Sequence, residues 1–165
     1  MRGEPVCGLM AMSIQENDSN QMARACNCLA IRQAARHVTQ FYDQLLAPSG
    51  LRATQFAILG HLQRGGPMTI NGLAAALVMD RTTLGRNLLP LERDGLIEIG
   101  PGRSDRRQRE VRLSAAGAAR LKAARRGWAK AQAQFDRVFG AERAAGLRDL
   151  LREVVASDFA AGAAG

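Results

Sequence analysis

The sequence predicts a mainly α-helical fold with one small β-hairpin, and three observations support this prediction. Only 4% of the 165 residues are aromatic, while alanine and leucine are abundant, which favours helices over a β-sandwich. Apolar residues recur with a helical period through most of the chain. Between residues 97 and 113 the period changes to two, as expected for paired strands.

The segment from Arg81 to about Asp94 is predicted to form an amphipathic helix. At about 100° per residue, one face carries Leu84, Leu88 and Leu91. The opposite face carries Thr82, Arg86 and Arg93. One face can therefore pack on a core while the other stays free.

Two residues bear on where this helix begins and ends. Asp80 is expected to be the N-cap, accepting a hydrogen bond from the amide of Thr82 or Thr83. Pro90 lacks an amide donor and releases the carbonyl of Arg86, so a kink or an early end of the helix is expected.

The segment beyond this helix is predicted to form a hairpin with one covered face. That face is expected to consist of Ile97, Ile99, Val111 and Leu113. The first strand is expected to be broken by the run Gly100, Pro101, Gly102. The connecting loop is too long for a tight turn, and it holds four arginines around one aspartate: Arg103, Arg106, Arg107, Arg109 and Asp105.

A helix followed by a basic hairpin is the order of a winged helix, which binds duplex DNA. The helix fits the major groove, where Arg bonds guanine and Thr contacts a thymine methyl. The loop is expected to follow the phosphates and to insert an Arg into the minor groove. The alternative is a hairpin tip that is merely solvated.

The charge distribution supports nucleic-acid binding. The formal net charge is +8, and 12 Arg or Lys stand against 5 Asp or Glu between Arg81 and Arg126. Most of the positive charge therefore lies in one segment, as a polyanionic partner requires. Only two of the 23 basic residues are lysine, so the preference for arginine can also reflect coding bias.

Two short helices are expected behind the reading helix. Residues 54–63 are predicted to form the first, with Phe56, Leu59 and Leu62 on its apolar face. The second is expected to be capped by Thr69 and to pack through Leu73, Ala74 and Leu77.

Longer helices flank this module, with apolar residues repeating at spacings of three and four. The predicted organisation is a mobile tail over 1–20, a helix region over 22–50, the winged helix over 51–113, helices over 114–159 and a second tail over 160–165. The flanking helices suit either an intramolecular bundle or a dimer interface.

The stretch from Leu51 to Gly117 resembles the MarR family of bacterial regulators. The resemblance lies in LRATQFAILGHL, TINGLAAAL, the helix with its DRR wing, and LSAAG, and it extends more loosely from about Met22 to Phe159. It implies a homodimer that presents two winged helices to double-stranded DNA at an inverted-repeat operator, with recognition helices about 34 Å apart. It therefore favours dimerisation over the bundle.

The resemblance also implies which residues contact DNA. The recognition-helix positions are Arg81, Thr82, Thr83, Arg86 and Asn87. Arg107 corresponds to the minor-groove residue of the wing, and Asp105 braces the loop. The predicted contact set is completed by Thr69, Arg103 and Arg106.

Cys28 is the leading candidate for a switch. The resemblance places it where the organic-hydroperoxide-sensing branch of the family keeps its reactive Cys, and Tyr42 where that branch keeps a Tyr bonded to the sulfur. Arg32, where the branch has a second Tyr, can lower the pKa of the thiol. Cys7 can resolve an oxidised Cys28 or Cys26, although Cys26 is expected to point to another side of the helix.

Other interpretations of Cys28 stay open. A free Cys is often a small buried hydrophobe. A metal site is disfavoured, because Cys26 and Cys28 diverge on a helix, and neither metal nor cofactor is expected. If the thiol is inert, the family's usual alternative is a small anionic aromatic or other lipophilic ligand in a crevice near Arg32, Arg36, His37, Tyr42 and His61.

Two further classes of function are weighed against a regulator. An enzyme is not expected, since HExxH, GxSxG, GxxxxGK[ST] and GxGxxG are absent, and a thiol peroxidase using Cys28 is the strongest enzymatic alternative. An architectural protein would bind any duplex about equally.

With no apolar run of 18 residues, no membrane span is expected. Three Cys without an export signal indicate the cytoplasm.

Overall fold

The computed structural model describes Gln21 and residues 24–102 and 105–159. The chain forms two compact units, Met1–Phe41 and Tyr42–Gly165. The predicted tails, together with Cys7 and Arg103, lie outside the described residues.

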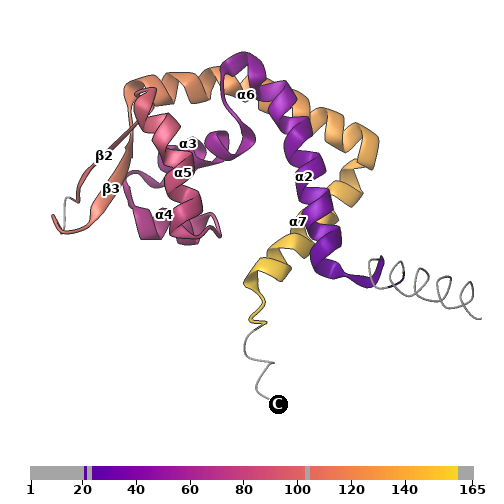
Figure 1. The fold of residues 1–165 in the computed structure, drawn as a ribbon. Coiled ribbons are helices and arrows are strands. Elements are labelled where there is room, and N and C mark those ends of the chain that lie inside the picture. The colour runs from indigo at the N-terminus through magenta and orange to yellow at the C-terminus, as the bar shows by residue number, and fades with distance from the viewer. Residues whose placement is uncertain (1–20, 22–23, 103–104, 160–165) are drawn as a thin grey trace, which may run out of the picture. The chain divides into compact units, whose positions relative to one another are not determined.

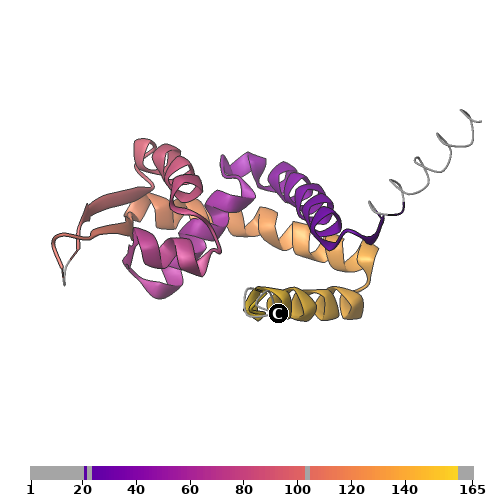
Figure 2. The ribbon, with the colours of Figure 1, turned by 60° about the horizontal axis from the view of Figure 1, so that its bottom comes forward.

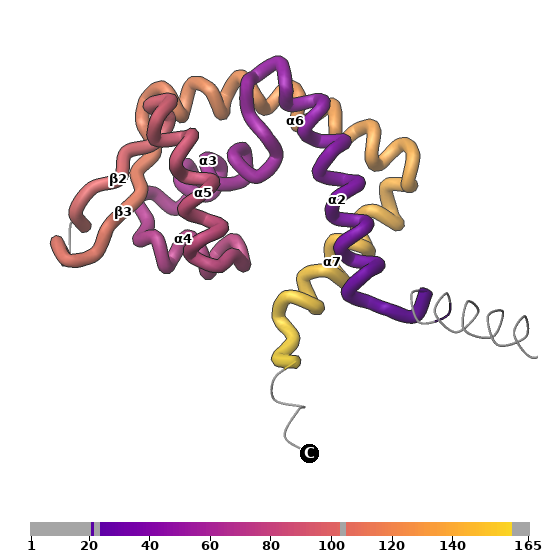
Figure 3. Tube along the Cα trace, viewed as in Figure 1, coloured from indigo at the N-terminus to yellow at the C-terminus, as the bar shows by residue number. Residues whose placement is uncertain are grey.

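The described elements follow the predicted order, and Figures 1 and 3 trace them along the chain. They are α2 (Asn27–Leu46), the 3-10 helix η1 (Ala47–Ser49), α3 (Ala53–Gly65), β1 (Met68–Thr69), α4 (Ile70–Ala76), α5 (Arg81–Arg93), β2 (Ile97–Pro101), β3 (Arg109–Leu113), α6 (Ala115–Phe139) and α7 (Ala141–Ala156). The predicted class, mainly α with a winged helix-turn-helix and a small β wing, is confirmed. Among the described helices, none combines the length and the apolar character needed to cross a membrane.

The sheet has three antiparallel strands in the order β1-β3-β2. Ile97 pairs with Leu113 and Ile99 with Val111, so the four predicted residues share one face. That face is covered, because Ile97 and Val111 are buried and the other two pack on the core. The two-residue strand β1 was not predicted from the sequence.

The predicted break of the first strand is wrong. Strand β2 continues through Gly100 to Pro101, which pairs with Arg109. Since β2 lies at the edge of the sheet, a proline that cannot donate is tolerated there.

The core of the second unit brings α3, α4, α5 and the sheet together around one cluster. Its buried members are Leu46, Leu51, Ile58, Leu59, Leu62, Leu73, Ala74, Leu84, Leu88, Leu91, Leu96, Ile97, Val111, Leu121 and Ala124. Each fully buried leucine contributes about 1.5–3 kcal/mol to folding. Phe56 packs against this cluster and stacks on Trp128 with 6.2 Å between ring centroids, which ties α3 to α6.

Pro90 does not end helix α5, which continues to Arg93. An internal proline costs about 3 kcal/mol, but it is followed by Leu91, which is only 1% exposed. The helix end is further held by the Asp94 amide, which donates to the Pro90 carbonyl at 3.0 Å, and by the Leu96 amide, which donates to Leu91 at 2.8 Å. Tertiary burial therefore offsets the local penalty.

The turn between α4 and α5 contains a strained residue. Val78 has φ of 51°, in the left-handed region that β-branched residues avoid. Its neighbour Met79 donates an amide bond to the Ala74 carbonyl at 2.9 Å, so the turn stays tight.

Helix α7 folds back beside the second half of α6, as Figure 2 shows. Gly140, with φ of 95°, makes the bend, and Arg148 lies 3.8 Å from Asp136 across the two helices. Large apolar side chains of the C-terminal segment stay exposed in the single chain: Leu150, Leu151, Val154 and Val155 of α7, and Phe159 beyond its end. This helix hairpin therefore has an apolar surface that the chain itself leaves open.

Helix α6 begins in close contact with the end of the hairpin. Ser114 caps it by accepting the Gly117 amide at 3.0 Å, and its hydroxyl donates to the Gly95 carbonyl at 2.7 Å. A Cβ at Gly117 would lie 2.0 Å from the Leu96 carbonyl oxygen. Only glycine allows this approach.

Replacing Gly117 with Ala should therefore lower the free energy of unfolding by about 1–3 kcal/mol or more, because the added methyl has no space. Gly146→Ala is the matched control, since nothing lies within 4 Å of a Cβ at that helical position. The control should gain about 1 kcal/mol from helix propensity. Urea denaturation of both variants measures the difference, and equal stabilities would contradict the tight packing.

Candidate nucleic-acid interface

Helix α5 has one buried and one exposed face, as its sequence predicts. Its leucines at 84, 88 and 91 are 0–2% exposed and belong to the core. Thr82, Arg86 and Arg93 are exposed. Burial of the leucines therefore fixes which side chains α5 presents outward.

Asp80 caps α5, which confirms its predicted role. Its carboxylate accepts the Thr83 amide at 2.8 Å and the Thr83 hydroxyl at 2.6 Å. The side-chain bond from Thr83, followed by the backbone bond, holds the pKa of Asp80 below its usual value. The hydroxyl of Thr83 is thus already engaged in capping.

Asn87 is similarly engaged in part. Its amide nitrogen donates to the Thr83 carbonyl at 2.8 Å, one turn earlier in the helix. Its amide oxygen has no such bond to another described residue, and the side chain is half-buried. Of the predicted reading residues, Arg81, Thr82 and Arg86 have side chains that make no hydrogen bond to another described residue.

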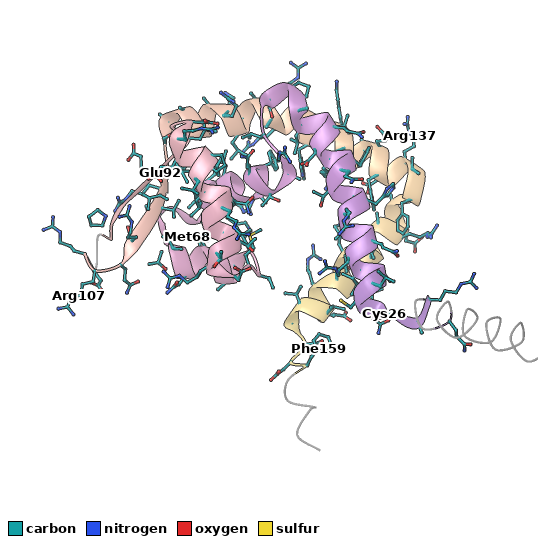
Figure 4. The ribbon with its side chains drawn as sticks, in the orientation of Figure 1. Cys26, Met68, Glu92, Arg107, Arg137 and Phe159 are labelled. Atoms are coloured by element: carbon teal, nitrogen blue, oxygen red, sulfur yellow. The ribbon has the colours of Figure 1, made fainter. Side chains whose placement is uncertain are left out.

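The wing loop is held together by Asp105. Its carboxylate accepts the Arg107 amide at 2.9 Å and the Gln108 side-chain amide at 3.3 Å. The Gly102 amide donates to the Gln108 carbonyl at 2.8 Å, and a Cβ at Gly102 would lie 2.5 Å from the Asp105 carbonyl oxygen. Arg107 extends from the tip of this loop, away from the sheet (Figure 4).

The base of the wing contains an ion pair that the sequence analysis did not single out. Glu110 is 9% exposed, and its carboxylate lies 3.1 Å from a guanidinium nitrogen of Arg112. The same nitrogen donates to the Pro101 carbonyl at 2.6 Å. The signal was available, because residues two apart on a strand share one face.

The wing arginines consequently differ in role. Arg109 donates to the Ile99 carbonyl at 3.2 Å, and Arg112 is bound at the base. The guanidinium groups of Arg106 and Arg107 make no hydrogen bond to another described residue, and both side chains are exposed. Two arginines therefore stabilise the hairpin edge while two are presented to solvent.

An open cavity of about 400 Å³ lies between the wing and the starts of α4 and α5. It is lined by Thr69, Ile70, Asn71, Arg81, Arg107, Gln108 and Arg109. It brings together three predicted contact residues, Thr69, Arg81 and Arg107, and adds polar groups at 71, 108 and 109. Thr69 also caps α4 by accepting the Gly72 amide at 3.0 Å, as predicted. Guanidinium and amide donors converging on one space suit a phosphate group.

The predicted sensing residues of the first unit lie on α2. Cys28, Arg32, Arg36 and His37 are all exposed. The interpretation of Cys28 as a buried hydrophobe is therefore wrong for the single chain.

The assumption behind the expected orientation of Cys26, that one helix runs through this residue, is wrong. Helix α2 begins at Asn27, and Cys26 lies before it (Figure 4). Its sulfur accepts the Leu29 amide at 3.4 Å, and its carbonyl accepts the Ala30 amide at 3.0 Å. Cys26 thus occupies the capping position of the helix.

Tyr42 and His61 belong to the second unit, and both are half-buried. The Tyr42 hydroxyl donates to the side-chain oxygen of Gln132 on α6. Burial raises the pKa of Tyr42, the Asp136 carboxylate raises it further, and Arg148 opposes these effects. In the described residues no group of three His, Cys, Asp or Glu is placed to hold a metal ion.

The cap at Asp80 predicts a pH-dependent contribution to stability. Because the pKa is lowered in the folded chain, the contribution is present above the ordinary pKa and is lost as pH falls through the lowered value. The stability difference between the native chain and Asp80→Ala should therefore be largest near neutral pH and vanish in acid. Asp80→Asn, which caps without titrating, should keep an advantage over Ala at every pH in the same chemical-denaturation series. A difference that does not change with pH would contradict the assignment.

Comparison with known proteins identifies relatives of this chain. A MarR-family model matches residues 49–108. The transcriptional regulator MosR of M. tuberculosis is 34% identical, with a TM-score of 0.67 over 80% of this chain and 97% of that chain. The structure of MosR in complex with DNA is also 34% identical, with a TM-score of 0.66 over 80% and 99%. BpsR of Bordetella bronchiseptica, whose DNA binding is regulated by 6-hydroxynicotinic acid, is 25% identical, with a TM-score of 0.70 over 81% and 95%.

No curated protein matches the sequence. The family model covers the segment from η1 to the wing, and the solved regulators cover most of the remaining helices as well. The chain therefore belongs to the MarR family, which is a family of DNA-binding transcriptional regulators and not of enzymes.

Proposed function

We propose that the protein is a homodimeric repressor that binds an inverted-repeat operator in the cytoplasm and leaves it on a small-molecule or oxidative signal. The observation that carries this proposal is the continuous set of donors formed by the exposed face of α5, the start of α4 and the wing. Such a surface complements a groove and its phosphates.

The contacts divide by groove. Thr82 and Arg86 are exposed on α5, and Asn87 has an amide oxygen without an internal donor among the described residues, so all three suit base edges in the major groove. Arg106 and Arg107 suit the minor groove or its phosphates, and Arg103 belongs to the same loop. Thr69, Arg81 and Arg109 line the cavity and suit a phosphate between the two elements. Thr83 supports the cap rather than reading a base.

The dimer is proposed from the apolar surface of the C-terminal helices. Leu150 and Val155 are 61% and 64% exposed, and Val138 near the end of α6 is 78% exposed. A monomer seldom exposes so many large apolar side chains close together along the chain, because burying each one contributes about 1.5–3 kcal/mol of free energy. A second copy that covers this surface would pair two winged helices by two-fold symmetry.

Arg107→Ala should weaken operator binding by about 1–3 kcal/mol, because the side chain is presented from the wing tip and has no internal partner to replace. Arg137→Ala in α6 is the matched control, as it removes one exposed arginine outside the wing and should leave the affinity unchanged. Fluorescence anisotropy with a labelled promoter fragment, competed by unrelated duplex, measures both. Unchanged affinity in the wing variant would remove Arg107 from the interface, and equal competition by unrelated duplex would favour an architectural protein.

Two signals remain in competition. The exposed thiols of Cys26 and Cys28 favour an oxidative signal, since access is the first requirement of a sensing thiol. Regulation of BpsR by 6-hydroxynicotinic acid supports a small anionic aromatic ligand, for which Arg32, Arg36, His37, Tyr42 and His61 are the candidates.

Cys28→Ser should bind the operator as the native chain does but should no longer be released by an organic hydroperoxide. Cys26→Ser is the matched control, two residues away and equally exposed, and should still be released. Release is measured by anisotropy against a panel of hydroperoxides and phenolic acids. Normal release of the Cys28 variant by hydroperoxide would remove the thiol switch, and release by an aromatic acid alone would establish the ligand.

A further inference from the structure

One leucine of the recognition helix departs from the pattern of the others. Leu89 is 66% exposed, whereas the leucines at 84, 88 and 91 of the same helix are at most 2% exposed. It lies within about 60° of Thr82, Arg86 and Arg93 around the helix axis. An apolar side chain therefore stands at one edge of the face that the helix presents outward.

Gly85, one turn before Leu89, has no internal reason to be glycine. Nothing in the described structure lies within 4 Å of a Cβ built at this position, and its φ is not positive. Glycine inside a helix is nevertheless unfavourable relative to alanine. By contrast, Gly117 and Gly127 of α6 are required by backbone carbonyls at 2.0 and 2.3 Å. Gly85 is half-buried and lies about 40° from Leu89 around the helix axis, so the lack of a side chain there leaves room beside Leu89.

The charge around Leu89 and Gly85 indicates which partner binds there. Arg86 lies about one turn before Leu89 and Arg93 about one turn after it, so the partner is anionic, and the family binds DNA. The one apolar group that major-groove base edges offer is the thymine C5 methyl. We propose that Leu89 is a specificity-determining residue that packs on a thymine methyl, while Gly85 lets the base edge approach the helix backbone. This inference rests on the proposed use of α5 as the reading helix.

The test starts from an operator obtained by selecting random duplex with the full-length native protein. Each thymine of the selected site is then replaced in turn by deoxyuridine, which removes only the methyl group. At one thymine or more in each half-site, the native protein should lose affinity about fourfold, the value for one buried methylene-sized group. Leu89→Ala should bind the thymine operator about fourfold or more weakly and should be insensitive to deoxyuridine at that position. Leu89→Met should behave as the native protein does.

The role proposed for Gly85 is tested by measuring the melting temperature and the operator affinity of the same variant. Gly85→Ala should raise the melting temperature, because the site is open, yet weaken operator binding. Gly146→Ala, an equally open helical position in α7, should raise the melting temperature and leave binding unchanged.

The outcomes separate this inference from the function on which it rests. If selection yields an operator but no deoxyuridine weakens binding, or if Leu89→Ala keeps the same sensitivity, the methyl contact is wrong while the regulator stands. Unchanged operator affinity in Gly85→Ala overturns the close approach. If selection yields no preferred sequence, the proposed function fails and this inference fails with it.

Discussion

Burial of three leucines on one side of α5 is the constraint on which the rest of the structure depends. Because Leu84, Leu88 and Leu91 are locked in the core, the helix cannot rotate, and Thr82 and Arg86 must face outward. The same burial carries the helix past Pro90 and positions the residues that lead into β2. Orientation of the reading face is therefore a consequence of packing rather than of the polar residues that use it.

Much of the fold follows from local pattern. The register of Ile97 with Leu113 and Ile99 with Val111, and the caps at Thr69, Asp80 and Ser114, are set by side-chain period and by hydroxyl or carboxylate groups before helices. Strand β1 could not be predicted, because two residues have no period and pair only when β3 is beside them. The extension of β2 through Pro101 and of α5 past Pro90 likewise depend on partners distant in sequence. For the site, the residue types were available from the sequence, but the different roles of the wing arginines were not.

Those arginines show how one residue type serves two purposes. Arg112 is held between Glu110 and the Pro101 carbonyl, and Arg109 reaches the Ile99 carbonyl, so both cover the open edge of β2. Arg106 and Arg107 lie in the loop that the Asp105 carboxylate holds together, and their side chains are exposed. A count of positive charge does not distinguish these roles, since all four lie within seven residues of sequence. The buried carboxylate of Glu110 distinguishes Arg112, and the Ile99 carbonyl distinguishes Arg109, from the exposed Arg106 and Arg107.

The close contact at Gly117 couples the first turn of α6 to the hairpin. With the Leu96 carbonyl oxygen 2.0 Å from where a side chain would begin, the first turn of α6 cannot slide on the hairpin and must move with it. A helix of 25 residues is about 37 Å long, so a tilt of about 5° shifts one end by about 3 Å relative to the other. A small displacement at the α7 end would thus reach the wing through α6 and would also move the core contacts that Leu121 and Ala124 make.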